Sequence, residues 1–172
     1  MIRFILFVCL ISVAETKNVP TADFYPAENA LLALQKTLKV KEVKMSAPVE
    51  IGEKFANGKK VVVYRFSAGT EYKNLLAVFT ESKGRYDMFD YLLICNDKAV
   101  IQLVKILKYR SEHGGEIASK KWLEQFKNYS GGNLYYGEDI SAISGATISA
   151  MSITRDIPKV INLLKENYLT GE

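Results

Sequence analysis

Four short runs of β-branched and aromatic residues follow one another through the middle of the chain, separated by short connections. The four runs are residues 60–66, 75–80, 89–95 and 100–109. The turn signals beside them are Asn57-Gly58, Lys83-Gly84-Arg85 and Asn96-Asp97. Short connections join antiparallel neighbours, because a parallel crossover needs a dozen or more residues. The pattern predicts an antiparallel meander, with residues 100–109 as a central strand because both of their faces are largely apolar.

Helical periodicity is found on both sides of these runs. Apolar residues recur at spacings of three and four in residues 27–38, which predicts an amphipathic helix. Its predicted stripe consists of Ala27, Leu31, Leu34 and Leu38, widened by Leu32. Residues 119–126 predict a short helix with Ser119 as N-cap and its apolar side formed by Trp122, Leu123 and Phe126. Residues 153–164 keep the helical spacing through Pro158, which predicts one kinked helix. The predicted fold class is α+β, an antiparallel meander with packed helices in a single domain.

The N-terminus has the pattern of an export signal. Arg3 precedes an apolar run over residues 4–14, and Ser12 and Ala14 provide the small residues of a cleavage site. The run is too short to span a bilayer, which needs about 20 apolar residues. We therefore predict a signal peptide over residues 1–14, a loose arm over residues 15–26 and one domain over residues 27–172. The alternative for the run is a buried core segment, and membrane association is expected only through an uncleaved signal.

Composition narrows the chemistry that the chain can perform. The chain has 23 Lys and Arg against 19 Asp and Glu, a formal charge of +4 without a basic run interleaved with aromatics, so nucleic acid is not an expected partner. With one His and two Cys, and with no CxxC or HExxH spacing, no metal site is expected. Cys95 lies in an apolar run and is expected to be a buried, unreactive thiol. Redox chemistry would therefore depend on an organic cofactor.

A stretch of small residues precedes the last predicted helix, with the sequence Ser144-Gly145-Ala146-Thr147-Ile148-Ser149. Gly145 and Ala146 allow another group to approach the backbone closely. A helix N-terminus has N–H groups without intrahelical partners and the positive end of the helix dipole, so it suits a phosphate. The ordinary alternative is a helix start capped by one of the three hydroxyl groups.

The run SGATIS resembles the flavinylation motif of the FMN-binding domain family, which includes the C subunit of sodium-pumping NADH:quinone reductase and the G subunit of the Rnf complex. The resemblance implies that Thr147 carries FMN through a phosphoester bond made by a dedicated flavin transferase. It also implies cofactor contacts from the neighbouring residues Ser144, Gly145, Ala146, Ile148 and Ser149. Residues 109–117 and 122–126 are similar to the stretch that precedes the motif in small secreted members, so the resemblance covers residues 59–164.

The upstream loop adds three candidates for flavin contact, namely Glu112, His113 and Gly114. The alternatives are a solvated loop histidine and a turn glycine. Tyr135 and Tyr136 are expected either to stack on the isoalloxazine or to pack on the sheet. Many family members carry an acid three positions before the first Ser of the motif, where this chain has Ser141, and the nearest acid is Asp139. The loss of that acid predicts slower modification, or FMN held without a covalent bond.

Together these observations favour an exported flavoprotein that binds FMN and acts in extracytoplasmic electron transfer, in the periplasm or another exported location. We expect an electron carrier that works with membrane or periplasmic redox partners, more than a stand-alone enzyme. Two alternatives stay open at this point. One is a secreted binding module without a cofactor, because an α+β scaffold does not dictate function. The other is a redox sensor that holds FMN noncovalently.

Overall fold

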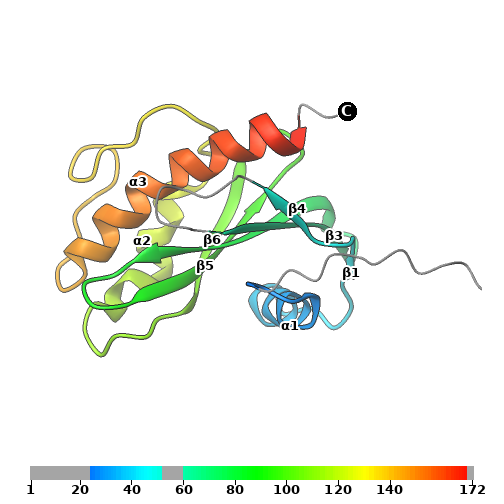
Figure 1. The fold of residues 1–172 in the computed structure, drawn as a ribbon, viewed down its shortest axis with the longest axis horizontal. Helices are drawn as coiled ribbons and strands as arrows, with labels where there is room; N and C mark the ends of the chain where they lie inside the picture. Colours follow the sequence, from blue (N-terminus) through cyan, green and yellow to red (C-terminus); the bar gives the residue numbers. More distant parts are fainter. Residues whose placement is uncertain (1–23, 52–59, 170–172) are drawn as a thin grey trace, which may run out of the picture.

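A computed structural model describes residues 24–51 and 60–169 of the chain (Figure 1). Three of the sequence-based predictions lie wholly or mostly outside these residues: the signal peptide, the arm and the turn at Asn57-Gly58. For the described residues, the predicted α+β class and the antiparallel meander are confirmed.

Six strands of the described residues form one sheet in the order β1-β3-β4-β5-β6, with β2 also beside β3. The strands are β1 (Lys44–Met45), β2 (Val49–Ile51), β3 (Val61–Ala68), β4 (Tyr72–Lys83), β5 (Met88–Cys95) and β6 (Ile101–Lys108). Strands β3 to β6 form the meander, and all the pairings are antiparallel. The β5–β6 turn has a local cause, because the Asn96 side chain accepts hydrogen bonds from the N–H groups of Lys98 and Val100, at 3.0 and 2.9 Å.

Strand β6 lies at an edge of the sheet, so the prediction of a central strand is wrong. Among the described strands it pairs with β5 alone. Its two apolar faces have another cause, because core side chains cover the sheet on both sides. Val104 and Ile106 belong to one core cluster, whereas Leu103 and Leu107 pack against the other. An apolar pattern on both faces therefore indicates that both faces are buried. An edge strand can be buried on both faces as well as a central strand can.

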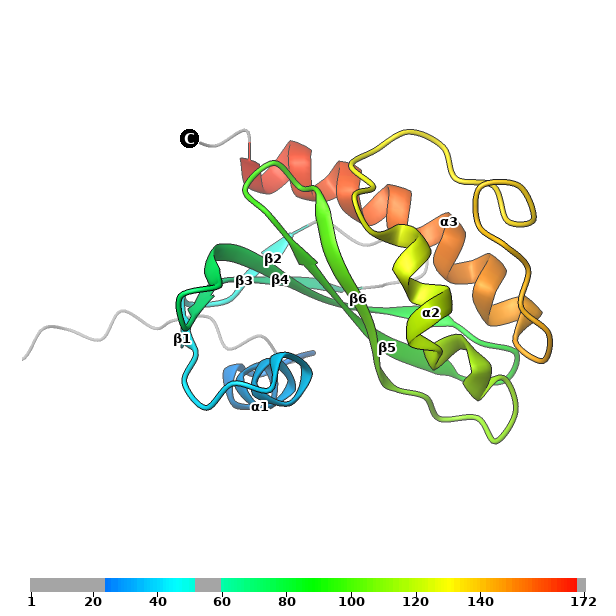
Figure 2. The same ribbon diagram turned by 180° about the vertical axis from the view of Figure 1, so that it is seen from behind.

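Helices cover both faces of the sheet, as Figures 1 and 2 show from opposite sides. Helix α1 (Ala27–Leu38) lies on one face, and α2 (Lys120–Leu123) and α3 (Thr147–Leu164) lie on the other. Each face has its own apolar core, the larger of the two under α2 and α3. Within residues 24–51 and 60–169, none of the helices combines the length and the apolarity that a membrane span requires.

Helix α1 has the predicted bounds, but its buried stripe is rotated. Ala30 and Leu34 are the buried residues, and Ala27, the predicted start of the stripe, is exposed. Leu32 is 63% exposed, so it does not widen the apolar face. The line through Ala30 and Leu34 faces the sheet, and Leu32 lies on the opposite face of the helix. Ala27 lies on the same face as Leu34 but is exposed at the first position of the helix.

The short helix predicted over residues 119–126 is confirmed in position but not in type. It is α-helical over Lys120–Leu123 and continues as a 3-10 helix over Glu124–Phe126. Ser119 occupies the N-cap position without a side-chain hydrogen bond to the helix. Its predicted apolar side is buried, and consists of Trp122, Leu123 and Phe126.

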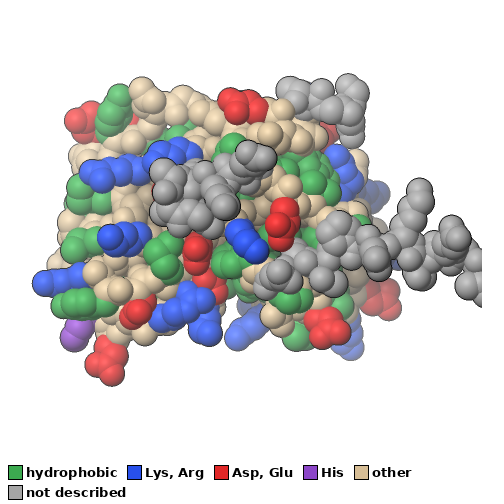
Figure 3. Space-filling model, in the orientation of Figure 1, with side chains coloured by type: hydrophobic (Ala, Val, Ile, Leu, Met, Phe, Trp, Pro, Cys, Tyr) green, Lys and Arg blue, Asp and Glu red, His purple; other side chains and the backbone are tan. Residues whose placement is uncertain are grey.

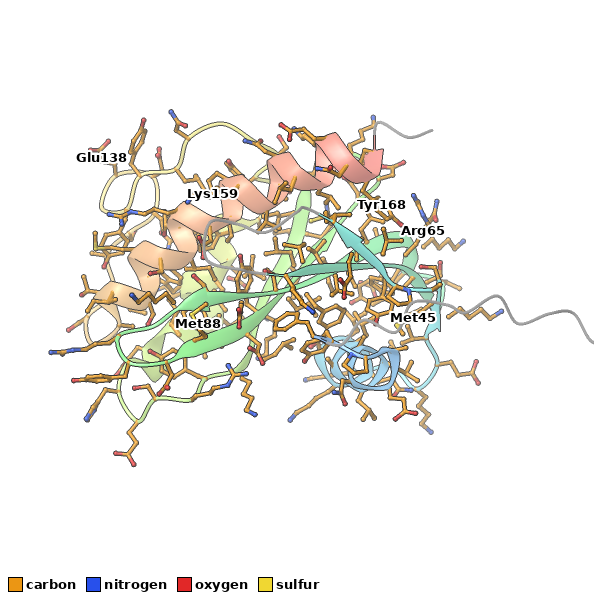
Figure 4. All side chains as sticks on the ribbon, viewed as in Figure 1. Met45, Arg65, Met88, Glu138, Lys159 and Tyr168 are labelled. Atoms are coloured by element: carbon orange, nitrogen blue, oxygen red, sulfur yellow. The ribbon has the colours of Figure 1, made fainter. Side chains whose placement is uncertain are left out.

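Helix α3 is one helix that continues through Pro158, as its periodicity predicts. A π-helical segment, Lys165–Leu169, follows it, and the guanidinium carbon of Arg65 lies 5.7 Å from the centre of the Tyr168 ring. Figure 4 shows this pair at one end of the molecule and Glu138, on the loop before α3, near the other end. The start of α3 therefore lies far from the π-helical segment after α3, where Tyr168 contacts Arg65 of β3.

Candidate functional site

A cavity of about 230 Å³ lies at the start of α3. Three segments far apart in the sequence form it: the β4–β5 hairpin turn, the chain after β6 and the small-residue loop that enters α3. The lining residues are Arg85, Tyr109, His113, Gly114, Gly145, Ala146, Thr147, Ile148 and Ser149. The start of α3 lies at the left end of the molecule in Figure 1, and at the same end Figure 3 shows Lys and Arg side chains next to hydrophobic ones.

The first turn of α3 leaves its backbone donors available. Ala146 is the N-cap residue and makes no side-chain cap, so the alternative of a helix start capped by a hydroxyl group at the N-cap is wrong. The N–H groups of Thr147, Ile148 and Ser149 have no partner within the helix, because the first intrahelical bond runs from the N–H of Ala150 to Ala146. Thr147 is exposed beside the cavity, so its hydroxyl group is open to reaction from outside.

The inner wall of the cavity is built around the Tyr109 hydroxyl group. It shares a hydrogen bond of 2.8 Å with the hydroxyl group of Ser149, which is 2% exposed. Gly114 lies so close that an added Cβ would be 2.4 Å from the Tyr109 oxygen, and an added Cβ on Gly84 would be 3.6 Å from it. The φ of Gly114 is +93°, a conformation that side chains disfavour. The 3.6 Å distance at Gly84 is an ordinary contact, so it is Gly114 that allows the tyrosine hydroxyl group to reach α3.

The loop before α3 is held by side chains of α2, of the 3-10 helix that follows α2 and of the loop itself. The Trp122 indole N–H donates to the Ser141 carbonyl at 2.7 Å, and the Ser141 N–H donates to the Gln125 side-chain oxygen at 2.9 Å. Further along, the Ile143 N–H donates to the Tyr136 hydroxyl oxygen at 3.1 Å. These bonds fix the path of the backbone directly before Ser144.

The predicted site residues divide into two groups. The structure brings most of them together around one cavity: Gly145, Ala146, Thr147, Ile148, Ser149, His113 and Gly114. Ser144 and Glu112 are exposed and are not among the residues that line it. Tyr135 and Tyr136 do not line it either, since Tyr136 holds the loop and packs against the core, and Tyr135 is 54% exposed.

Sequence reasoning did not identify two of the lining residues as site residues, Arg85 and Tyr109. Arg85 lies in the predicted turn between β4 and β5, with its guanidinium 5.3 Å from the centre of the exposed Tyr86 ring. The only signal in the sequence is a cation at a hairpin tip, and such a cation is usually solvated. Tyr109 follows β6 directly, and in the sequence an aromatic residue at this position indicates ordinary packing on the sheet.

An ion pair between the exposed Arg110 and the buried Asp90 holds the chain next to Tyr109. The Arg110 guanidinium donates to Asp90 at 2.8 Å and to the Met88 carbonyl at 2.8 Å. The hydrogen bond with Asp90 raises the pKa of Arg110 above its ordinary value. The second carboxylate oxygen of Asp90 is buried without a hydrogen-bond partner, so Arg110 is the main compensation for this charge.

Other chemistry is limited by the side chains present. The described residues contain no group of three His, Cys, Asp or Glu side chains that could hold a metal ion. Cys95 is fully buried, and burial raises the pKa of its thiol from 9.0 to about 12, so it is a poor nucleophile at neutral pH. What the cavity offers is a guanidinium, backbone donors and an exposed hydroxyl group, which together suit a phosphate ester.

No protein-family model matches the chain, and no curated protein matches it either. The resemblance to FMN-binding domains therefore depends on the motif residues themselves.

Proposed function

We propose that this chain is an exported flavoprotein that carries FMN on Thr147 and transfers electrons outside the cytoplasm. The observation that carries the proposal is the position of Thr147, which is exposed on the first turn of α3 and beside a cavity lined by Arg85. The SGATIS run, which resembles the flavinylation motif, supplies this threonine. Export is proposed from residues 1–14, and a covalent bond would keep the flavin on a protein that has left the cytoplasm.

The residues present fit the phosphate end of FMN. The Arg85 guanidinium and the free N–H groups of the first turn of α3 are suitable donors for phosphate oxygens. Pockets for ligands of this size usually enclose about 300–1,000 Å³. The cavity, at about 230 Å³, is therefore suited to the phosphate and part of the ribityl chain. The exposed side chain of Ile148, which lines the cavity, would provide apolar surface for the isoalloxazine.

Attachment requires an activated donor, because a free phosphate is a poor electrophile. In the proposed step, the oxygen of the Thr147 hydroxyl group forms a bond to phosphorus as the phosphoanhydride bond of an activated FMN donor breaks. The leaving group departs with the electrons of that bond, and the hydroxyl proton passes to solvent or to the flavin transferase. The chain gains one FMN less one water.

When bound, FMN supplies the redox chemistry, since it accepts and releases electrons one or two at a time. The chain would position it, because Arg85 would neutralise phosphate charge and the bond between the Tyr109 and Ser149 hydroxyl groups fixes the inner wall of the cavity. Membrane or periplasmic redox proteins would be the electron donor and acceptor.

Intact-mass spectrometry of the chain produced together with a flavin transferase tests the proposal. The mass is expected to rise by one FMN less one water, and Thr147→Ala should abolish the rise. Thr70→Ala, which changes an exposed threonine in the β3–β4 turn, is the matched control and should keep it. A colourless chain without the added mass would overturn the proposal and favour a binding module without a cofactor.

A second candidate is a protein that binds FMN without the covalent bond, which Ser141 favours by standing at the position of the family's acid. In that case the purified protein is yellow, but denaturation and filtration remove the flavin from the chain. Covalently attached flavin stays with the chain under the same treatment, so the absorption spectrum separates the two candidates.

A further inference from the structure

A carboxylate lies against the small-residue loop, and it comes from a distant segment. Glu116 belongs to the 3-10 helix η1 (Gly115–Ala118), which follows the loop that carries His113. A Cβ built on Gly145 would lie 2.8 Å from Cδ and 2.9 and 3.0 Å from the two oxygens of the Glu116 carboxylate. The carboxylate therefore occupies the space of a side chain at position 145, two residues before Thr147.

The acid that is nearest to the motif in sequence is committed elsewhere. The Asp139 carboxylate accepts a hydrogen bond of 2.9 Å from the Tyr135 N–H, so it stabilises its own turn. At Ser141 the backbone is held on both sides by Trp122 and Gln125, and the exposed side chain is a neutral hydroxyl.

We infer that Glu116 is the acidic residue by which the modifying enzyme recognises the Thr147 site. This inference rests on the proposed function. Glu116 is exposed, so a cationic group of the enzyme can reach its carboxylate. It is not among the residues that line the cavity, so the phosphate can enter beside Arg85 while the carboxylate remains accessible from outside.

The position of Glu116 relative to Thr147 is fixed by the packing of its segment. The bond between Tyr109 and Ser149 ties the start of this segment to α3, and Gly114 lies against the Tyr109 oxygen. The positive end of the α3 dipole also favours a carboxylate beside the first turn. Glu116 thus supplies a negative charge at the motif through tertiary structure, where Ser141 does not supply one through local sequence.

The test is the rate of flavin attachment by a flavin transferase, followed by intact mass, in wild type and in Glu116→Gln. Loss of the charge is expected to slow attachment by about tenfold, because hydrogen bonds to charged groups contribute about that factor to recognition. Glu138→Gln, which neutralises an exposed acid on the loop before α3, is the matched control and should react at the wild-type rate. An equal rate for wild type and Glu116→Gln would overturn the inference.

A rescue variant separates recognition from a merely structural role. Adding Ser141→Asp to Glu116→Gln places an acid at the family's position on a backbone that is already held, and is expected to restore most of the lost rate. Unfolding midpoints of all variants should agree with that of wild type. Failure of the rescue, or a similar slowing in Glu138→Gln, would overturn the recognition role. Absence of attachment in wild type would instead overturn the proposed function itself.

Discussion

The hydroxyl groups of Tyr109 and Ser149 meet at 2.8 Å and join the chain after β6 to the first turn of α3. Both residues line the cavity, and Ser149 is only 2% exposed. The contact therefore determines how close the loop with His113 and Gly114 lies to Thr147. Variants at this contact test the architecture of the site without reference to any ligand.

Tyr109→Phe is expected to lower the free energy of unfolding by about 1–2 kcal/mol, because the buried Ser149 hydroxyl loses its partner. Tyr86→Phe removes the hydroxyl of a tyrosine that is 66% exposed and serves as the control, with little expected change. Urea unfolding of the two variants and wild type measures both effects. Equal stability of Tyr109→Phe and wild type would show that this bond does not hold the site together.

Gly114→Ala is expected to be more destabilising than Gly132→Ala. The two glycines have similar φ angles, +93° and +104°, so both substitutions introduce backbone strain of about 1–3 kcal/mol. The added Cβ at Gly114 would also lie 2.4 Å from the Tyr109 oxygen, whereas nothing lies within 4 Å at Gly132. We expect the overlap to add about 1–3 kcal/mol at Gly114.

Thermal or urea unfolding of the two glycine variants provides the comparison, and the difference between them isolates the contact with Tyr109. If Gly132→Ala were as destabilising as Gly114→Ala, the effect would come from the backbone conformation alone. The tight approach of Gly114 to the tyrosine would then have no energetic consequence.

Much of the sheet can be predicted from sequence because its causes are local. Asn96 caps the β5–β6 turn with its own side chain, and short connections leave antiparallel pairing as the simple solution. The edge position of β6 is hidden in its sequence, since core side chains cover both of its faces and make both of them apolar. A bulge is also hidden from the alternation pattern: Ile94 pairs with Leu103, but Cys95 pairs with Ile101, so Ile101 joins the same core as Val104.

The candidate site shows the same division between local and tertiary causes. The loop that enters α3 can be located from its small residues and from the periodicity that follows them. Arg85 and Glu116 cannot be assigned to it in this way, because each reaches the loop only through pairing of strands or packing of a 3-10 helix. Residues that meet through tertiary structure have no spacing rule that would reveal them.

Arg110→Met is expected to lower the free energy of unfolding by about 1–2 kcal/mol, because the buried Asp90 carboxylate loses a hydrogen-bonded cation whose own side chain is partly screened by water. Lys108→Met removes a positive charge from the exposed residue paired with Asp90 across the strands, and should change stability little. Urea unfolding at low salt is the measurement. The double variant Asp90→Asn with Arg110→Met should be more stable than Arg110→Met alone, and the opposite order would contradict this account of the pair.

Cys95 gives a prediction for alkaline pH. Burial raises the pKa of its thiol from 9.0 to about 12 in the folded chain, so the unfolded chain loses the thiol proton first. The stabilisation from the neutral buried thiol is complete below pH 9 and is lost as the pH rises from 9 toward 12. Because the folded and unfolded chains differ by one bound proton in this range, the free energy of unfolding falls by about 1.4 kcal/mol per pH unit. Cys95→Ala lacks this pH-dependent contribution. Its smaller side chain is expected to lower the free energy of unfolding by about 1–2 kcal/mol at every pH.

Urea unfolding of wild type and Cys95→Ala at pH 7, 8, 9, 10 and 10.5 isolates the thiol, because the other titrating groups are common to both proteins. The difference in stability should be constant at pH 7 and 8. Above pH 9 it should shift in favour of the variant by about 1.4 kcal/mol per unit. A constant difference up to pH 10.5 would mean that the thiol ionises in the folded chain, which is incompatible with its complete burial between β4, β6 and the core beneath α3.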